Sequence, residues 1–137
     1  MPYRYTGFPL DFNKEFLLIK EMRPAWDMDR LIAASLTGGI EKGSTPLETA
    51  IKELKEETGY TSDKIETLGQ TFVAKASDTL CWLFAVDVTD LVPEEIKGDG
   101  TGLESMSEPI WVNEKALLTV LDPLVAQMYL RFINLKQ

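Results

Sequence analysis

The sequence contains no histidine and a single cysteine, Cys81, among its 137 residues. The absence of histidine excludes the Ser/His and Cys/His arrangements of hydrolases and any His-ligated zinc site. A general acid or base in this chain must therefore be a carboxylate, a lysine, a tyrosine or a metal-bound water. Because one cysteine cannot form a disulfide within the chain, the sequence fits a reducing compartment, and we expect a cytoplasmic protein.

Long apolar runs and an excess of positive charge are also absent. No run approaches the roughly 18 residues of a membrane span, and the stretch Met1–Leu10 lacks the apolar region of a signal peptide. The net charge of −8 opposes binding to nucleic acid or to an anionic membrane surface. We therefore expect no nucleic-acid polymer and no membrane as partner. A phosphate-bearing ligand would need cations at its binding site.

The composition is ordinary for a globular protein, with 45% hydrophobic and 26% charged residues. The length predicts a single domain over residues 1–137. Runs rich in β-branched and aromatic residues are interspersed with helical patterns, so we expect an α/β fold. The sequence predicts strands at residues 15–22, 30–37, 65–74, 79–90 and 109–112, and helices at 46–58, 113–121 and 122–136.

The helix at residues 46–58 has the clearest boundary signals. Thr45 can cap its N-terminus, and Gly59 stands where a glycine commonly ends a helix. At about 100° per residue, the apolar residues of this helix fall on one face. The predicted core stripe consists of Leu47, Ala50, Ile51 and Leu54.

Three carboxylates, Glu53, Glu56 and Glu57, are crowded toward the end of this helix. The helix dipole disfavours negative charge there, and like charges one turn apart repel each other. At this point two explanations stay open: a solvated acidic face, or a site for a divalent ion with oxygen ligands. The glycine-rich residues 38–43 just before the helix favour the ion, because backbone groups can approach a ligand closely there.

Residues 38–60, with the sequence GGIEKGSTPLETAIKELKEETGY, resemble the Nudix box. The pattern of that motif is G-x5-E-x7-R-E-U-x-E-E-x-G-U, where U is a bulky aliphatic residue. Its fixed positions span a loop, a helix and the helix cap, so agreement in register is specific. The chain agrees with the motif at Gly38, Glu53, Leu54, Glu56, Glu57 and Gly59.

The chain departs from the motif at three positions. Ser44 stands at a glutamate position, Lys52 at the arginine position and Tyr60 at the last aliphatic position. In the family the arginine helps to hold the neighbouring glutamate, which is Glu53 here. Lysine carries the charge but lacks the bidentate fork of arginine. The departures therefore concern the efficiency of catalysis and leave the metal ligands in place.

The resemblance implies the Nudix fold, an α/β/α sandwich with a mixed β-sheet and the loop and helix of the box. It also implies a divalent cofactor, Mg²⁺ or alternatively Mn²⁺. The expected metal ligands are the glutamates of the box, with the carbonyl of the first glycine nearby. These residues are Glu53, Glu56, Glu57 and Gly38.

In the family a further glutamate reaches the metal from a loop. Residues 98–112, GDGTGLESMSEPIWV, resemble that loop and the strand after it; Glu104 is the best match for the glutamate and Glu108 the second. The catalytic base is either Glu53 or a loop glutamate such as Glu104, because the family uses both arrangements. Lys52 is expected to support catalysis by holding Glu53.

The activity implied by the resemblance is metal-dependent hydrolysis of a nucleoside diphosphate linked to another moiety, by attack of water on the diphosphate. Residues 16–29, FLLIKEMRPAWDMD, look like the matching part of ADP-ribose and ADP-sugar pyrophosphatases. There an arginine before proline, here Arg23, can contact the diphosphate of the substrate. Two alternatives stay open: a nucleoside triphosphate pyrophosphohydrolase, and a weakly active nucleotide-binding protein of the same fold.

The C-terminal helix is apolar over much of its circumference, because Leu130 and Ile133 widen its apolar stripe. Such a helix needs more than one covering surface. Many members of the family are homodimers, so we expect a homodimer. The stripe consists of Leu124, Val125, Met128, Phe132 and Leu135.

Overall fold

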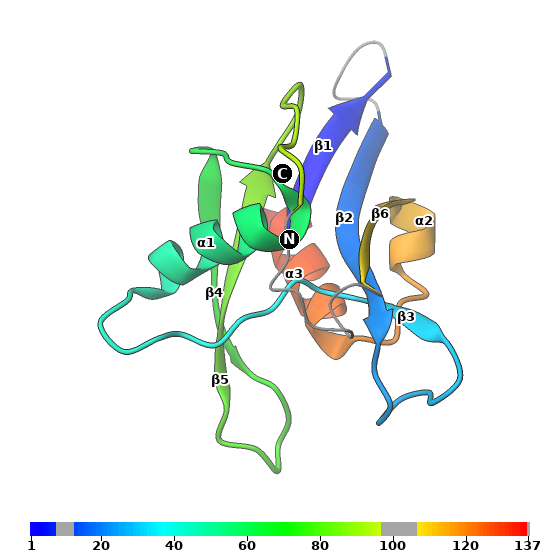
Figure 1. Ribbon diagram of the computed structural model, residues 1–137, viewed down its shortest axis with the longest axis vertical. Coiled ribbons are helices and arrows are strands. Elements are labelled where there is room, and N and C mark those ends of the chain that lie inside the picture. The colour runs from blue at the N-terminus through cyan, green and yellow to red at the C-terminus, as the bar shows by residue number, and fades with distance from the viewer. Residues whose placement is uncertain (8–12, 97–106, 137) are drawn as a thin grey trace.

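The computed structural model describes residues 1–7, 13–96 and 107–136. None of the helices in these ranges has the length and apolarity of a membrane span. Figure 1 shows the elements in chain order. They are β1 (Pro2–Thr6), β2 (Asn13–Met22), β3 (Leu31–Ala34), α1 (Pro46–Thr58), β4 (Ile65–Phe72), β5 (Leu80–Asp87), β6 (Glu108–Asn113), α2 (Glu114–Leu117) and α3 (Pro123–Leu135).

The strands form a mixed sheet in the order β3-β2-β1-β5-β4, with β6 paired to β2 beside this path. β1 and β5 are parallel, and the other pairs are antiparallel. β2 pairs with β1 through residues 13–16 and with β3 through residues 19–22, while β6 lies along its other edge. The sheet therefore divides beyond β2 into a β1-β5-β4 branch and a β3 branch.

α1 and α3 cover opposite faces of this sheet (Figure 1). The alternation of side chains along β2 supplies both interfaces. Phe16 belongs to the core cluster under α3, where its ring centroid lies 5.6 Å from that of Phe132. Leu17 points the other way and shares a cluster with Leu54 of α1. This arrangement confirms the predicted α/β sandwich with a mixed sheet.

The apolar stripe of α3 is largely used inside the chain. Val125, Met128 and Phe132 are buried in the core cluster. Leu130 and Leu135 are exposed. The homodimer stays a prediction.

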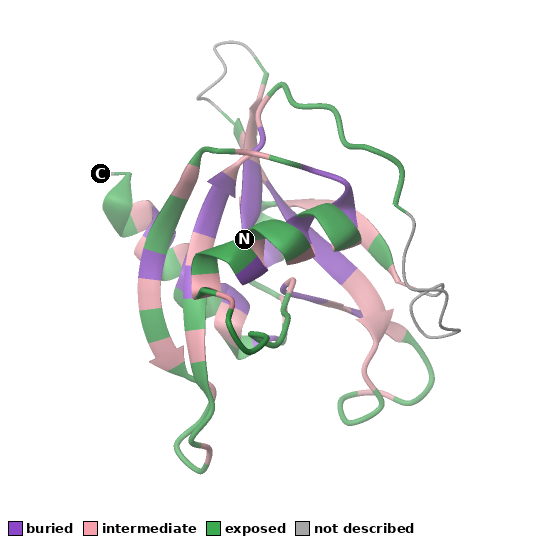
Figure 2. Cartoon of the chain, turned by 60° about the vertical axis from the view of Figure 1, so that its left-hand side comes forward, coloured by how far each residue is buried: buried purple, intermediate pink, exposed green. Residues whose placement is uncertain are grey.

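The predicted core stripe of α1 is partly wrong. Leu54 is buried and Ala50 half-buried, but Leu47 and Ile51 are exposed. Figure 2 shows the exposed surface running along the outer side of α1. The side of α1 that faces the sheet is therefore different from the side on which its apolar residues lie.

The inner side of α1 can include two buried threonines because each hydroxyl donates a hydrogen bond to a backbone carbonyl one turn earlier. Thr49 Oγ1 donates to the Thr45 carbonyl at 3.0 Å, and Thr58 Oγ1 donates to the Leu54 carbonyl at 2.5 Å. A buried hydroxyl that keeps a hydrogen bond avoids most of the cost of burial. The same orientation of α1 leaves Glu53 and Glu57 half-buried on the inner side of the helix.

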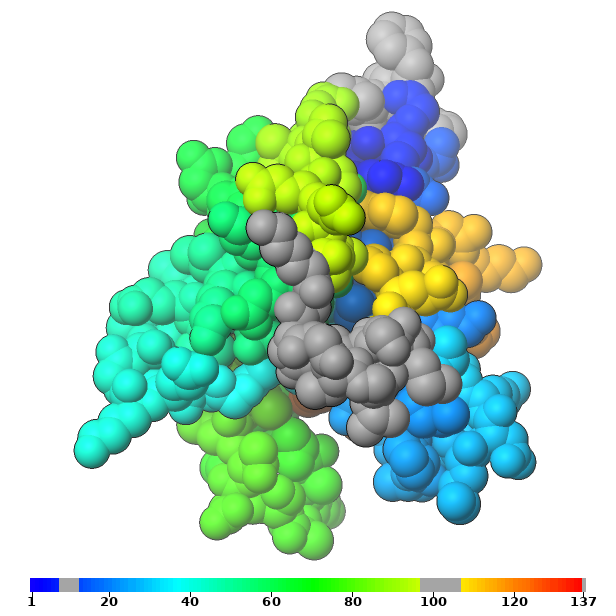
Figure 3. Space-filling model, in the orientation of Figure 1, coloured from blue at the N-terminus to red at the C-terminus, as the bar shows by residue number. Residues whose placement is uncertain are grey.

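Both ends of α1 agree with the sequence. Thr45 Oγ1 accepts from the Glu48 amide at 3.1 Å, and Gly59 adopts φ 78° with its amide donating to the Lys55 carbonyl at 2.9 Å. The backbone of Glu94 approaches this glycine closely. A Cβ at position 59 would lie 2.0 Å from the Glu94 carbonyl oxygen. The segment of residues 88–96 accordingly lies beside the end of α1 (Figure 3).

Several elements differ from the sequence predictions, including β5, which ends at Asp87 and is shorter than the predicted strand at 79–90. β1 was not predicted, because its run Pro2–Thr6 is short and begins with proline. β3 ends at Ala34, so the predicted strand at 30–37 is too long. The predicted helix at 113–121 is also too long: α2 ends at Leu117, and Leu118 and Thr119 form a turn.

Asp122 joins the start of α3 to the end of β3. Its side chain, in a residue only 5% exposed, accepts from the Leu124 amide at 2.9 Å through Oδ1. Oδ2 accepts from the amide and the hydroxyl of Ser35, at 2.8 and 2.5 Å. The buried carboxylate thus caps a helix and holds the residue that begins the loop to Gly38.

We predict that Asp122→Asn lowers the free energy of unfolding by about 2–4 kcal/mol, because an amide group cannot accept both hydrogen bonds from Ser35 while capping α3. Urea denaturation measures this change. The control is Asn113→Ala, which removes the cap of α2 and should cost about 1 kcal/mol. Equal losses in the two variants would show that the link to Ser35 contributes nothing.

Candidate active site

The loop that follows β3 brings Gly38 against Glu53 of α1. A Cβ atom at position 38 would lie 2.4 Å from Glu53 Cδ and 2.6 Å from its Oε1. Real side chains do not approach so closely, so Glu53 can keep this position only if residue 38 is glycine. The first glycine and the first helical glutamate of the sequence motif are therefore in contact.

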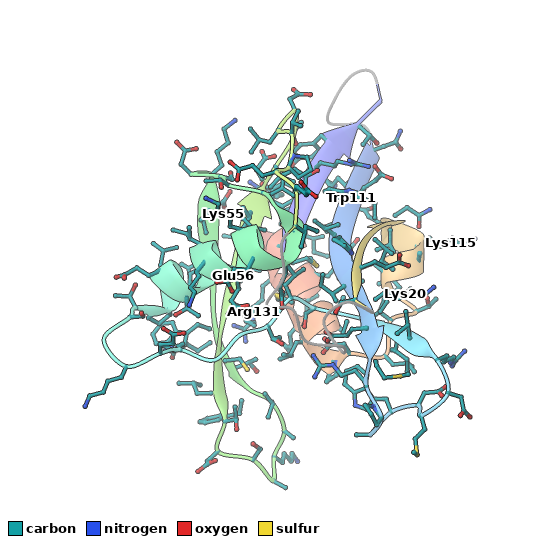
Figure 4. The ribbon with its side chains drawn as sticks, viewed as in Figure 1. Lys20, Lys55, Glu56, Trp111, Lys115 and Arg131 are labelled. Atoms are coloured by element: carbon teal, nitrogen blue, oxygen red, sulfur yellow. The ribbon has the colours of Figure 1, made fainter. Side chains whose placement is uncertain are left out.

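The other two glutamates of α1 face different directions. Glu57, one turn beyond Glu53, is half-buried, and its Oε2 atom is buried. Glu56 is exposed and lies on the outer side of α1 with Lys55 (Figure 4). The structure thus brings two glutamates to the inner side of the helix and leaves the third toward solvent.

A divalent metal fits this site in the chemistry of its donors. Carboxylate and carbonyl oxygens are the ligands that Mg²⁺ takes in proteins, and Glu53 lies against the Gly38 backbone. Within residues 1–7, 13–96 and 107–136, no three His, Cys, Asp or Glu side chains are close enough together to hold a metal. The predicted ligand Glu104 lies outside the described residues.

Lys52 lies on the outer side of α1 and pairs with Glu41. Its Nζ donates to Glu41 Oε1 at 3.0 Å and lies 3.9 Å from Glu56 Oε1. The hydrogen bond and charge of Glu41 raise the pKa of Lys52, and the charges of Glu56 and Glu53 act in the same direction. Glu41 was not singled out by the motif, because it lies between the motif's fixed positions.

Arg23 lies on the loop between β2 and β3, at the lower right of Figure 1. Its guanidinium pairs with Glu21, at 2.8 Å from Nε to Oε1, and lies 5.7 Å from the ring centroid of Trp26. Glu108, the second choice for a loop ligand, is exposed at the start of β6. Neither Arg23 nor Glu108 lines the cavity that Gly38 and Glu53 share.

That cavity has a volume of about 400 Å³, which is within the usual range for small-molecule sites. It lies between α1, the loop after β3, β5, the first turns of α3 and the first two residues of the chain. Gly38 and Glu53 form part of its wall, and Cys81 and Trp82 of β5 form another part. No pattern in the sequence indicates this cavity, because its lining comes from several separate parts of the chain.

Residues 4–132 match the NUDIX domain family. An RNA pyrophosphohydrolase of Cereibacter sphaeroides is 35% identical over 99 residues, covering 69% of this chain and 49% of that protein. An ADP-sugar pyrophosphatase of Mus musculus is 31% identical over 121 residues, covering 83% of this chain and 52% of that protein. The crystal structure of a C. elegans Ap4A hydrolase binary complex has a TM-score of 0.66 at 15% identity, covering 98% of this chain and 91% of that chain.

The match to the crystal structure shows a shared fold. Together with the family match, it confirms the fold that the sequence motif predicts. The chain spans about half the length of the curated relatives that it matches.

Proposed function

Because this chain belongs to the NUDIX domain family, we propose that it hydrolyses a nucleoside diphosphate linked to another moiety. The contact between Gly38 and Glu53 supports this proposal most directly, since it joins the two parts of the motif beside a cavity. The ADP-sugar pyrophosphatase among the relatives supports the choice of substrate class.

The residues of the site have distinct proposed roles. Glu53, Glu57 and the Gly38 carbonyl would hold Mg²⁺, or alternatively Mn²⁺, with Glu56 and Glu104 as the further ligands. When bound, the ion would neutralise the diphosphate oxygens and the leaving group. A chain with a net charge of −8 needs such a cation to attract a diphosphate.

The proton of the attacking water goes to a carboxylate of the chain. Glu53 is one candidate, because it borders the cavity; Glu104 is the other. Arg23 is proposed to contact the diphosphate, which requires it to exchange its pairing with Glu21 for the substrate.

A substrate screen tests the proposal against its rivals. The purified chain is incubated with ADP-ribose, a nucleoside triphosphate and an RNA with a triphosphate end, each with Mg²⁺ or Mn²⁺, and the products are identified. We expect two monophosphates from ADP-ribose. Cleavage of the nucleoside triphosphate alone, or of the RNA alone, would replace the proposed substrate class. Binding without any cleavage would favour the nucleotide-binding alternative.

We predict that Lys52→Arg leaves turnover unchanged or raises it by a few-fold, about 2- to 5-fold. Arginine keeps the charge and adds a bidentate fork, so it should hold the neighbouring Glu53 at least as well as lysine does. Steady-state kinetics on the same substrate measures the effect, with Lys55→Arg on the same helix as control. A large fall in turnover would show that the site depends on lysine itself.

We predict that Glu104→Gln lowers turnover on the order of 10²-fold or more, the scale of losing a general base or a charged ligand. The matched control is Glu108→Gln, which should change turnover little, because Glu108 is exposed at the start of β6. Melting temperatures should be similar in both variants. Kinetics in which Glu108→Gln is the impaired variant would reverse the choice between the two residues.

A further inference from the structure

The cavity beside Gly38 and Glu53 is bordered by large apolar side chains that are exposed to solvent. Ile40 is 48% exposed, Leu80 41% and Trp82 45%. Leu80 and Trp82 are two residues apart on β5, so they point to the same face of the sheet. Large apolar side chains gathered at a cavity typically mark a binding surface.

Glu53 is the charged side chain of the lining and belongs to the proposed catalytic site. The hydroxyl side chains of the lining are engaged or peripheral. Ser35 bonds to Asp122, and Thr49 Oγ1 donates to the Thr45 carbonyl. Thr37 and Thr79 belong to exposed segments, away from the buried part of the lining. Away from Glu53, recognition in this cavity therefore depends mainly on shape and apolar contact.

A sugar or a nucleobase would be a poor occupant of such a cavity. Each brings several hydrogen-bonding groups, and a buried group that finds no partner is unfavourable. An alkyl or aryl group has no hydrogen-bonding atoms, and each methylene that it moves out of water makes binding more favourable.

We infer that this cavity binds an apolar group of the substrate, so that the substrate is a nucleoside diphosphate esterified with an alkyl or aryl moiety. The inference rests on the proposed function. Water would add to one phosphorus while the bond from the bridging oxygen to that phosphorus breaks. For an alkyl ester of ADP, the products are AMP and an alkyl phosphate, and the second product takes the apolar group with it.

The test compares two substrates that share the same ADP portion, ADP-ribose and the hexyl ester of ADP. We expect the hexyl ester to have a kcat/KM at least tenfold higher, since burial of two methylenes corresponds to about tenfold. Ala50→Phe, which fills the cavity from α1, and Trp82→Ala, which removes part of its wall, should each reduce this preference. Leu118→Ala, at an exposed apolar residue outside the cavity, should keep it.

Equal kcat/KM values for the two substrates, or a preference that both cavity variants retain, would overturn the inference and leave the proposed function standing. If neither substrate is cleaved, the proposed function fails. In that case, titration calorimetry measures the binding affinity of the same two compounds and tests the inference without catalysis. Tighter binding of the hexyl ester that Ala50→Phe abolishes would support an apolar site, and equal binding would contradict it.

Discussion

Replacing Glu57 by glutamine should lower Mg²⁺-dependent hydrolysis on the order of 10³-fold, since a charged ligand contributes several kcal/mol and each 1.36 kcal/mol is about tenfold in rate. Glu57 is half-buried on the inner side of α1, one turn from the glutamate that contacts Gly38. Glutamine has the same shape, so the fold should survive. Steady-state kinetics and the melting temperature together measure the effect.

The control for this variant is Glu66→Gln. It removes one negative charge from β4, where Glu66 pairs with Lys136 at 2.7 Å, and should leave turnover near normal. Binding of Mn²⁺, followed by electron paramagnetic resonance without substrate, supplies a second readout. Normal hydrolysis and normal Mn²⁺ binding in Glu57→Gln would remove Glu57 from the metal site.

Replacing Gly38 by alanine should lower turnover on the order of 10²-fold, because displacement of a catalytic group by about 1 Å has effects of this size. The added Cβ would lie 2.4–2.6 Å from side-chain atoms of Glu53. Glu53 or the loop must therefore move. Kinetics on the substrate found in the screen measures the loss.

Gly39→Ala is a matched control, because a Cβ at that position meets nothing within 4 Å. Both substitutions reduce the backbone freedom of the same loop by a similar amount. A difference between them therefore reports the contact with Glu53. If Gly38→Ala retains turnover within about threefold of the unmodified protein, the contact has no part in catalysis.

The local features of α1 could be predicted because they depend on neighbouring residues. The Thr45 cap and the Gly59 terminus each involve residues within one helical turn, and both have the predicted geometry. The orientation of α1 could not be predicted in this way. It depends on which side of the helix meets the sheet, and the apolar residues Leu47 and Ile51 pointed to the wrong side.

Contacts between residues far apart in the chain also could not be predicted from the sequence. Asp122 caps α3 through the nearby Leu124 amide, but its hydrogen bonds to Ser35 join residues 87 positions apart. The apolar cavity likewise draws its lining from several elements, and Trp82 read only as a strand residue. The motif placed Glu53 and Gly38 in one site, whereas the pairing of Lys52 with Glu41 required the folded loop.

The most direct test of the central claim is hydrolysis of ADP-ribose in water labelled with heavy oxygen, with mass analysis of the products. The unmodified protein and Glu53→Gln are compared, each with and without Mg²⁺. The account predicts AMP and ribose phosphate with the label in one of the two phosphates. The unmodified protein with Mg²⁺ should form them faster than any of the other three combinations. Label-free products, equal rates in the two proteins, or no cleavage of bound ADP-ribose would contradict it.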